Sequence, residues 1–143
     1  MAPSPAELFE PSSALGRRVA GSLDPVGDAR RLLTQLSEAE KVQTLNAHPR
    51  IGERRDRISA SSRAEQGEDQ APPELERLNQ EYERRFGFRF VIFVNGRSKA
   101  EITEVLRERL RRGRAEEIDT GLTAIVDIAA DRLRKLEDPA AKP

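Results

Sequence analysis

Apolar residues recur along most of this chain at intervals of three or four positions, the spacing that places side chains on one face of an α-helix. Leu32, Leu33 and Leu36 follow this spacing in the first half of the chain, and Ile118, Leu122 and Ile125 follow it near the end. The predicted helices cover residues 6–9, 13–20, 26–36, 37–48, 59–69, 73–87, 98–113 and 115–136. We therefore predict an all-α fold, a compact bundle of six to eight helices.

Local signals mark where several of these helices begin and end. Ser37 and Ser98 are each followed three residues later by glutamate, the capping-box pattern of a helix start. Pro72-Pro73 places proline in the first turn of the next helix, and Gly87 is a natural residue to end it. The His48-Pro49 step should end the helix before it, because a residue that precedes proline disfavours helical backbone angles.

Residues 88–96, FRFVIFVNG, interrupt the helical spacing. Their aromatic and β-branched side chains are typical of a strand. A strand needs a partner, and the rest of the chain offers none. We therefore predict an extended, buried connector near 88–96 within a single domain that spans residues 1–143, a length that fits one domain.

The composition excludes several kinds of chemistry. The chain has 143 residues, no cysteine and one histidine. Without cysteine there are no disulfides, thiolate zinc sites or cysteine nucleophiles, and a single histidine excludes multi-histidine metal sites. Neither a metal-ligand spacing nor a glycine-rich phosphate loop is present, so we expect no metal.

Charge and hydropathy bear on partners and location. The longest apolar run, 90–94, is far too short to span a bilayer, and residues 1–10 lack the pattern of a signal peptide. We therefore expect a soluble, cytoplasmic protein without a membrane partner. The 25 basic residues balance the 25 acidic ones, which argues against broad affinity for nucleic acid. The arginine-rich run 107–114 keeps a small nucleic-acid-binding domain open as an alternative.

His48 is the first candidate for chemistry, because histidine alone has an unperturbed pKa near neutrality. It stands at a predicted helix end, immediately before Pro49. The dipole at a helix C-terminus favours the imidazolium form, which would make His48 a ready acid. A histidine that only caps the last helical carbonyls fits the same position, and both interpretations stay open.

Two further groups of residues carry polar chemistry, and each has a purely structural alternative. Ser62 and Glu65 stand three residues apart, so they form either a capping box or a site in which Glu65 orients an imidazole and Gln66 binds a polar ligand. Arg97 lies between Gly96 and a predicted helix start, a suitable place to hold an anion. An arginine in solvent on a linker explains Arg97 equally well.

Together these segments form a pattern that resembles a known family. The pattern consists of HPRIG at 48–52, S-x-x-E-Q at 62–66, N-x-x-Y-x-x-R-F-G-F-x-F at 79–90 and G-R-S at 96–98. It resembles the 2-oxo-4-hydroxy-4-carboxy-5-ureidoimidazoline (OHCU) decarboxylases, most densely over residues 44–110. The resemblance implies an all-α, cofactor-free and usually dimeric enzyme that converts OHCU to (S)-allantoin in urate degradation.

The resemblance also implies roles for individual residues. His48 would be the catalytic imidazole, Glu65 its partner and Arg97 the cation that binds the substrate. Substrate-binding roles are implied for Pro49, Ser62, Gln66, Phe90, Ile92 and Val94. The substrate supplies its own electron sink, a C=N bond beside the carbon that bears the carboxylate, so we expect no cofactor.

Two alternatives remain beside the nucleic-acid-binding domain. The chain would be a non-catalytic helical interaction module if the Ser62/Glu65 pair were only a cap and Arg97 only a surface residue. It would act on a related ureido compound if the Arg50-Ile51-Gly52 sequence, which stands where many members of the family have Asp-Leu-Ala, changed the substrate preference.

Overall fold

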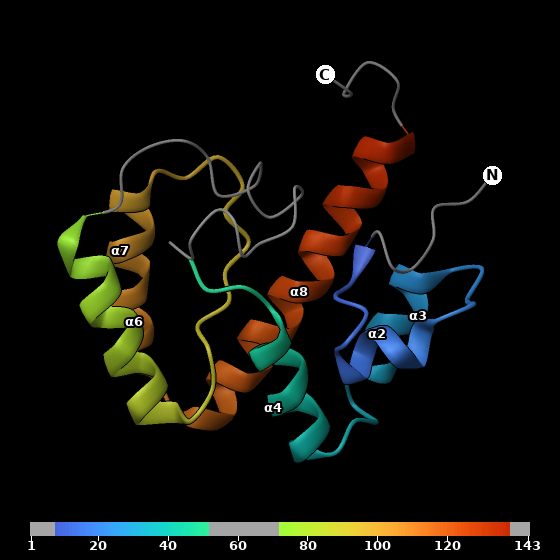
Figure 1. Cartoon of the computed structure of the whole chain (residues 1–143), viewed down its shortest axis with the longest axis horizontal. Helices are drawn as coiled ribbons and strands as arrows, with labels where there is room; N and C mark the ends of the chain where they lie inside the picture. The colour runs from blue at the N-terminus through green and yellow to red at the C-terminus, as the bar shows by residue number, and fades with distance from the viewer. Residues whose placement is uncertain (1–7, 52–71, 138–143) are drawn as a thin grey trace.

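The computed structural model describes residues 8–51 and 72–137, and these ranges contain six α-helices and no β-strand (Figure 1). The helices, in chain order, are α2 (Ala14–Val19), α3 (Pro25–Leu32), α4 (Glu38–Ala47), α6 (Pro73–Phe86), α7 (Lys99–Arg109) and α8 (Arg114–Glu137). The predicted all-α class is therefore confirmed. The helix predicted over residues 59–69 lies outside the described residues. None of the six helices combines the length and the apolar character that crossing a membrane requires.

The predicted signals at the helix ends are confirmed. The Ser37 hydroxyl accepts a hydrogen bond from the Glu40 backbone N–H at 3.1 Å, and the Glu40 carboxylate accepts one from the Ser37 N–H at 3.0 Å. Ser98 and Glu101 form the same reciprocal pair before α7, at 3.1 and 3.2 Å. Each pair satisfies two backbone donors at the helix start. Gly87 ends α6 with φ at 83°, a left-handed conformation that glycine adopts without steric cost.

Two helices end earlier than their hydrophobic spacing predicts. α3 ends at Leu32 instead of residue 36, and α7 ends at Arg109 instead of residue 113. In both places the chain closes a tighter turn. The Gln35 N–H donates to the Leu32 carbonyl at 2.8 Å, and the Arg112 N–H donates to the Arg109 carbonyl at 3.1 Å. Such three-residue turns stop the helix, yet Leu36 beyond α3 still reaches the core with 5% of its surface exposed.

α8 is the longest helix and lies between the α6–α7 pair and the α2–α3 pair in Figure 1. It packs against α3 and α4, and α2 packs against both of those helices, while α6 and α7 pack against each other. α4 approaches α8 closely at Gly121, where an added Cβ would come within 2.7 Å of the Leu45 side chain. The glycine therefore lets α8 hold α4, the helix that ends at His48.

The connector between α6 and α7 is extended, as predicted, and forms no sheet with the described residues. It runs as a single extended segment between the α6–α7 pair and α4 (Figure 1). Phe88 and Phe90 are buried and place their rings edge-on against Tyr82 of α6, at centroid distances of 5.9 and 5.4 Å. These aromatic contacts fix the path of the connector through the core.

A buried ionic cluster ties the connector to three helices. The Glu117 carboxylate of α8 is fully buried and accepts hydrogen bonds from the Tyr82 hydroxyl and from Arg109 Nε, each at 2.7 Å. Arg109 Nη1 donates to the Val91 carbonyl of the connector at 2.8 Å, and its guanidinium lies 4.5 Å from the centroid of the Phe90 ring. Burial and the hydrogen bond to Glu117 raise the pKa of Tyr82, so the phenol remains a donor.

Replacing Glu117 with alanine tests this cluster. The substitution leaves the Arg109 guanidinium buried without its carboxylate, and we expect it to lower the free energy of unfolding by about 3–5 kcal/mol in urea denaturation. Glu116→Ala is the matched control, because Glu116 also pairs with an arginine, Arg112, but is largely exposed. It should cost less than about 1 kcal/mol. Equal losses for the two variants would contradict the importance of the buried cluster.

Candidate active site

His48 lies at the C-terminal end of α4, where the chain turns from helix to extended backbone. Its φ and ψ are −78° and 139°, and its backbone N–H donates to the Leu45 carbonyl at 3.2 Å. The extended conformation is the one that a residue before proline prefers, so Pro49 ends the helix as the sequence predicts. The helix end therefore presents the imidazole beside α8 and the segment that precedes α2.

Side chains from α6 and the connector hold residues 48–51 in place. Arg89 Nη1 of the connector donates to the His48 carbonyl at 2.9 Å. Arg50 makes a two-pronged ion pair with Glu83 of α6, at 2.7 and 3.0 Å. Asn79 of α6 donates to the carbonyl of Ile51 at 3.2 Å, in the core. Three of the four residues in this segment are thus tied to elements that lie far from them in the sequence.

A small cavity adjoins His48, and we call it the His48 cavity. The described residues that line it come from the segment before α2, from α4 and from α8. They are Leu8, Phe9, Glu10, Ser13, Thr44, His48, Ile125, Ile128 and Arg132. Its volume of about 10 Å³ is roughly the space that one water molecule needs. The polar residues of this lining are a histidine, an arginine, a glutamate, a serine and a threonine.

Hydrogen bonds from α8 and α4 hold the segment before α2 and the first turn of α2. Arg132 Nη1 donates to the Leu8 carbonyl at 3.0 Å. The Ser13 hydroxyl donates to the Glu10 carbonyl at 2.8 Å, and Thr44 Oγ1 accepts the backbone N–H of Leu15 at 3.2 Å. Arg132, Ser13 and Thr44 are also residues of the cavity lining, so the residues that hold this segment lie beside the His48 cavity.

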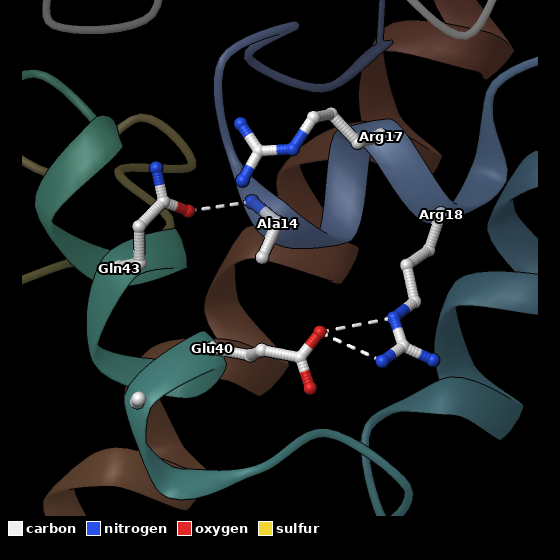
Figure 2. Close-up of a pocket in the computed structure, with 6 residues that line it drawn as sticks. Ala14, Arg17, Arg18, Glu40 and Gln43 are labelled. Atoms are coloured by element: carbon white, nitrogen blue, oxygen red, sulfur yellow. Dashed lines mark hydrogen bonds and ion pairs between the residues drawn. The ribbon is translucent and has the colours of Figure 1, made fainter.

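A larger hollow of about 380 Å³ lies elsewhere, between α2 and α4 (Figure 2). Its polar side chains mainly bond to one another or to backbone. Arg18 pairs with the Glu40 carboxylate at 2.7 Å, Gln43 accepts the Ala14 N–H, and Arg17 donates to the Ser12 carbonyl. Figure 2 shows the Arg18–Glu40 and Gln43–Ala14 contacts bridging the two helices. The contacts around the hollow therefore fasten α2 to α4. None of the residues that line it is a site residue predicted from the sequence.

The electrostatics of His48 differ from the prediction. Burial, assisted by the nearby guanidinium groups of Arg132 and Arg89, lowers the pKa of His48 to about 3. Taking a charged ring out of water is unfavourable, and like charges nearby make it more so. The expectation that the helix end favours imidazolium is therefore wrong, because these effects outweigh the helix dipole. His48 is therefore neutral at physiological pH, and its environment opposes protonation of the ring.

The other predicted site residues lie in several places. Ser62, Glu65 and Gln66 lie outside the described residues. Arg97 is exposed and donates to the Phe93 carbonyl at 3.2 Å. Among the predicted site residues that the structure describes, only His48 lines the cavity. Pro49 is its neighbour in the chain but is not part of the lining, and the connector side chains pack in the core. Those buried side chains are Phe90, Ile92 and Val94.

Arg132 is the functional candidate that sequence reasoning missed. It follows Ile125 and Ile128 at helical spacing, so the buried apolar face of α8 continues into a cation that is 8% exposed. An arginine on the inward face of an amphipathic helix is a signal that the sequence does contain. In the described parts of the chain, no group of three acidic or histidine side chains is arranged to hold a metal ion.

Four of the five arginines in the run 107–114 pair with carboxylates. Arg107 pairs with Glu74, Arg109 with the buried Glu117, and Arg114 with Glu38. Arg112 also contacts two carboxylates, those of residues 116 and 117. Because these guanidinium groups are engaged with carboxylates, the structure gives no support to the nucleic-acid-binding alternative.

Comparison with known proteins gives consistent results. Residues 6–134 match the family model described as OHCU decarboxylase. The chain is 33% identical over 109 residues to the 2-oxo-4-hydroxy-4-carboxy-5-ureidoimidazoline decarboxylase of Halalkalicoccus jeotgali, over 72% of this chain and 62% of that protein. It is 32% identical over 138 residues to the uric acid degradation bifunctional protein PucL of Bacillus subtilis, over 88% of this chain and 28% of that protein. The chain thus spans less than two thirds of the length of both relatives.

The fold is also similar to a solved structure. The crystal structure of OHCU decarboxylase in the presence of (S)-allantoin superposes with a TM-score of 0.72 at 26% sequence identity. The superposition covers 89% of this chain and 93% of that one. The similarity therefore includes nearly the whole length of both chains.

The lowered pKa of His48 predicts a pH dependence of stability. Between about pH 3 and the unfolded value near 6.5, the unfolded chain binds a proton at His48 that the folded chain does not. Stability should therefore fall as the pH falls through this window. Because solvent reaches part of the half-buried residue, we expect wild type to lose about 1–2 kcal/mol relative to His48→Gln between pH 7 and pH 5.

Urea unfolding of both proteins across this pH range measures the effect. The carboxylates that also titrate are common to the two proteins, so the difference between their free energies of unfolding isolates His48. A difference that stays constant, or that grows in favour of wild type as the pH falls, would contradict the assignment of a neutral imidazole.

Proposed function

The chain belongs to the OHCU decarboxylase family, and we propose that it catalyses the decarboxylation of OHCU to (S)-allantoin in urate degradation. The observation that carries the proposal is the His48 cavity, where the only histidine of the chain meets the guanidinium of Arg132. The names of the relatives, which include a uric acid degradation protein, support the same activity.

The chemistry requires few protein groups. The bond between the ring and the carboxylate breaks, CO₂ leaves, and the electron pair moves into the adjacent C=N group, whose nitrogen takes a proton. The enol-like product then loses the proton of its 4-hydroxyl and gains one at the neighbouring carbon, which yields the carbonyl of allantoin. The electron sink is part of the substrate, so we propose that no cofactor participates. The protein has to orient the substrate, exclude water and control which face is protonated.

A neutral His48 is suited to the step after CO₂ leaves, in which the enol-like product exchanges its 4-hydroxyl proton for one at the neighbouring carbon. In the free protein burial, assisted by the guanidinium groups of Arg132 and Arg89, keeps the imidazole uncharged, and the same guanidinium groups attract an anionic substrate. The substrate carboxylate then brings a negative charge next to the ring, which raises its proton affinity. We propose that His48 accepts the 4-hydroxyl proton and manages proton delivery to the adjacent carbon. Glu65 is proposed as its partner, as the family resemblance implies.

Two arginines are candidates for the cation that binds the substrate. Arg97 is implied by the resemblance, and Arg132 is supported by its place in the wall of the His48 cavity. We favour Arg132, because an exposed guanidinium such as that of Arg97 is screened by water, whereas a buried one acts in a lower dielectric. Since the cavity has space for roughly one water molecule, we propose that substrate binding widens it.

The remaining family features are proposals of the same kind. Pro49, Ser62 and Gln66 are proposed to contact the substrate, together with connector residues Phe90, Ile92 and Val94 through their backbone. We also propose that residues 1–143 form one domain, that the protein acts as a homodimer, and that it works in the cytoplasm.

The activity assay uses urate with uricase and hydroxyisourate hydrolase, which produce OHCU in place. Circular dichroism then follows optically active allantoin with and without this protein. We expect wild type to form (S)-allantoin faster than the racemic background. His48→Gln should lower kcat roughly 10²-fold or more, the usual contribution of a positioned acid–base group. An unchanged optical signal with wild type would contradict the proposed function.

Arg132→Gln and Arg97→Gln decide between the two candidate cations in the same assay. Loss of a buried guanidinium that contacts the substrate should lower kcat/KM by roughly 10²-fold, since charged hydrogen bonds contribute about 1.5–3 kcal/mol and leave buried partners unsatisfied. We expect this loss in Arg132→Gln to exceed the loss in Arg97→Gln. A larger loss in Arg97→Gln would show that the resemblance, and not the cavity lining, identifies the substrate cation.

A further inference from the structure

We propose that Arg89 is a positioning residue for His48, which it holds in place from the connector 41 residues further along the chain. The effect on turnover rests on the proposed function, whereas the effect on the imidazole itself does not. The family pattern found in the sequence does not specify this position, which lies between Phe88 and Phe90.

Arg89 contacts the end of α4 at two points. Its backbone N–H donates to the Asn46 side-chain carbonyl at 2.9 Å, and its guanidinium Nη1 donates to the His48 carbonyl at 2.9 Å. The two acceptors lie on either side of Ala47, in the last turn of the helix and at its C-cap. A helix end with unsatisfied carbonyls is free to fray, and these two bonds oppose fraying where the catalytic candidate stands.

The residues around Arg89 hold it firmly enough to act in this way. Phe88 and Phe90, its two neighbours in the chain, are buried with 2% and 1% of their surfaces exposed. Arg109 donates to the carbonyl of Val91, the residue that follows Phe90, at 2.8 Å. The backbone at Arg89 is thus fixed on both sides by core packing, so its guanidinium is directed from a rigid segment and not from a free loop.

Arg89 also sets part of the charge around His48. Among the described residues, the charged groups around the imidazole are Arg132 from α8, Glu10 from the segment before α2 and Arg89 from the connector. Arg132 lies in the cavity wall, whereas Arg89 reaches the backbone of His48 from outside it. Arg89 can therefore orient the histidine and disfavour its protonation without occupying space that the substrate needs.

The single histidine makes the test direct, because its ring signals in NMR spectra have one possible assignment. We compare wild type with Arg89→Gln, Arg89→Lys and Asn46→Ala. Arg114→Gln is the matched control, since Arg114 also donates to a carbonyl beside the connector, that of Phe86, but touches no residue of the 48–51 segment. Titration of the ring signal and the kinetics of OHCU decarboxylation are measured for all five proteins.

In Arg89→Gln the midpoint of the His48 titration should rise by roughly half a pH unit or more, because a cation is removed. Its kcat should fall roughly tenfold or more with little change in KM, because a misplaced acid–base group affects turnover more than binding. Arg89→Lys should restore the titration midpoint but only part of kcat, since lysine keeps the charge and lacks the planar fork. Asn46→Ala should lower kcat in the same way, and Arg114→Gln should match wild type.

Each result bears on the proposal. If Arg89→Gln and Asn46→Ala fold like wild type and leave both the ring titration and kcat unchanged, Arg89 does not position His48. If Arg89→Gln does not fold, Arg89→Lys and Asn46→Ala decide in the same manner. If wild type does not decarboxylate OHCU while the ring titration moves as expected, the proposed function fails and the positioning role stands.

Discussion

A carboxylate that is completely removed from water must be matched by donors and cations, and this requirement at Glu117 organises much of the fold. Arg109 is drawn into the core to meet Glu117, and its second contact, to the Val91 carbonyl, holds the connector against α6 and α8. The connector in turn carries Arg89, which bonds the carbonyl of His48. One buried charge is thus linked through a short series of contacts to the candidate catalytic residue.

Charged groups and burial also determine the properties of the candidate site. Around His48 the structure places two guanidinium groups and an enclosing wall, and burial with these charges keeps the imidazole neutral. A neutral base among cations disfavours a cationic ligand and favours an anionic one. In decarboxylation CO₂ leaves as a neutral molecule, and the negative charge of the carboxylate moves into the C=N group of the substrate, whose nitrogen takes a proton.

Much of the fold could be predicted from short-range rules, because capping boxes and left-handed glycines act within a few residues. Ser37, Ser98 and Gly87 mark helix ends where the structure has them. The site was harder to predict from the sequence, because it depends on which residues that are distant in the sequence lie together in the fold. The pKa of His48 is lowered first by burial and then by Arg132, 84 positions away, so a rule based only on its own helix gave the wrong direction. Arg132 could be placed beside His48 only once the path of α8 past the segment before α2 was known.

The central claim is that the space beside His48 binds the ureidoimidazole compounds of urate degradation. Titration of (S)-allantoin into the isotope-labelled protein, observed at the ring signals of the single histidine, tests it most directly. Binding in the His48 cavity predicts a saturable shift of these signals with (S)-allantoin and a weaker one with (R)-allantoin, because the site must distinguish the faces of the ring. Ring signals that stay unchanged at concentrations of (S)-allantoin that shift other residues would place the ligand elsewhere and contradict the claim.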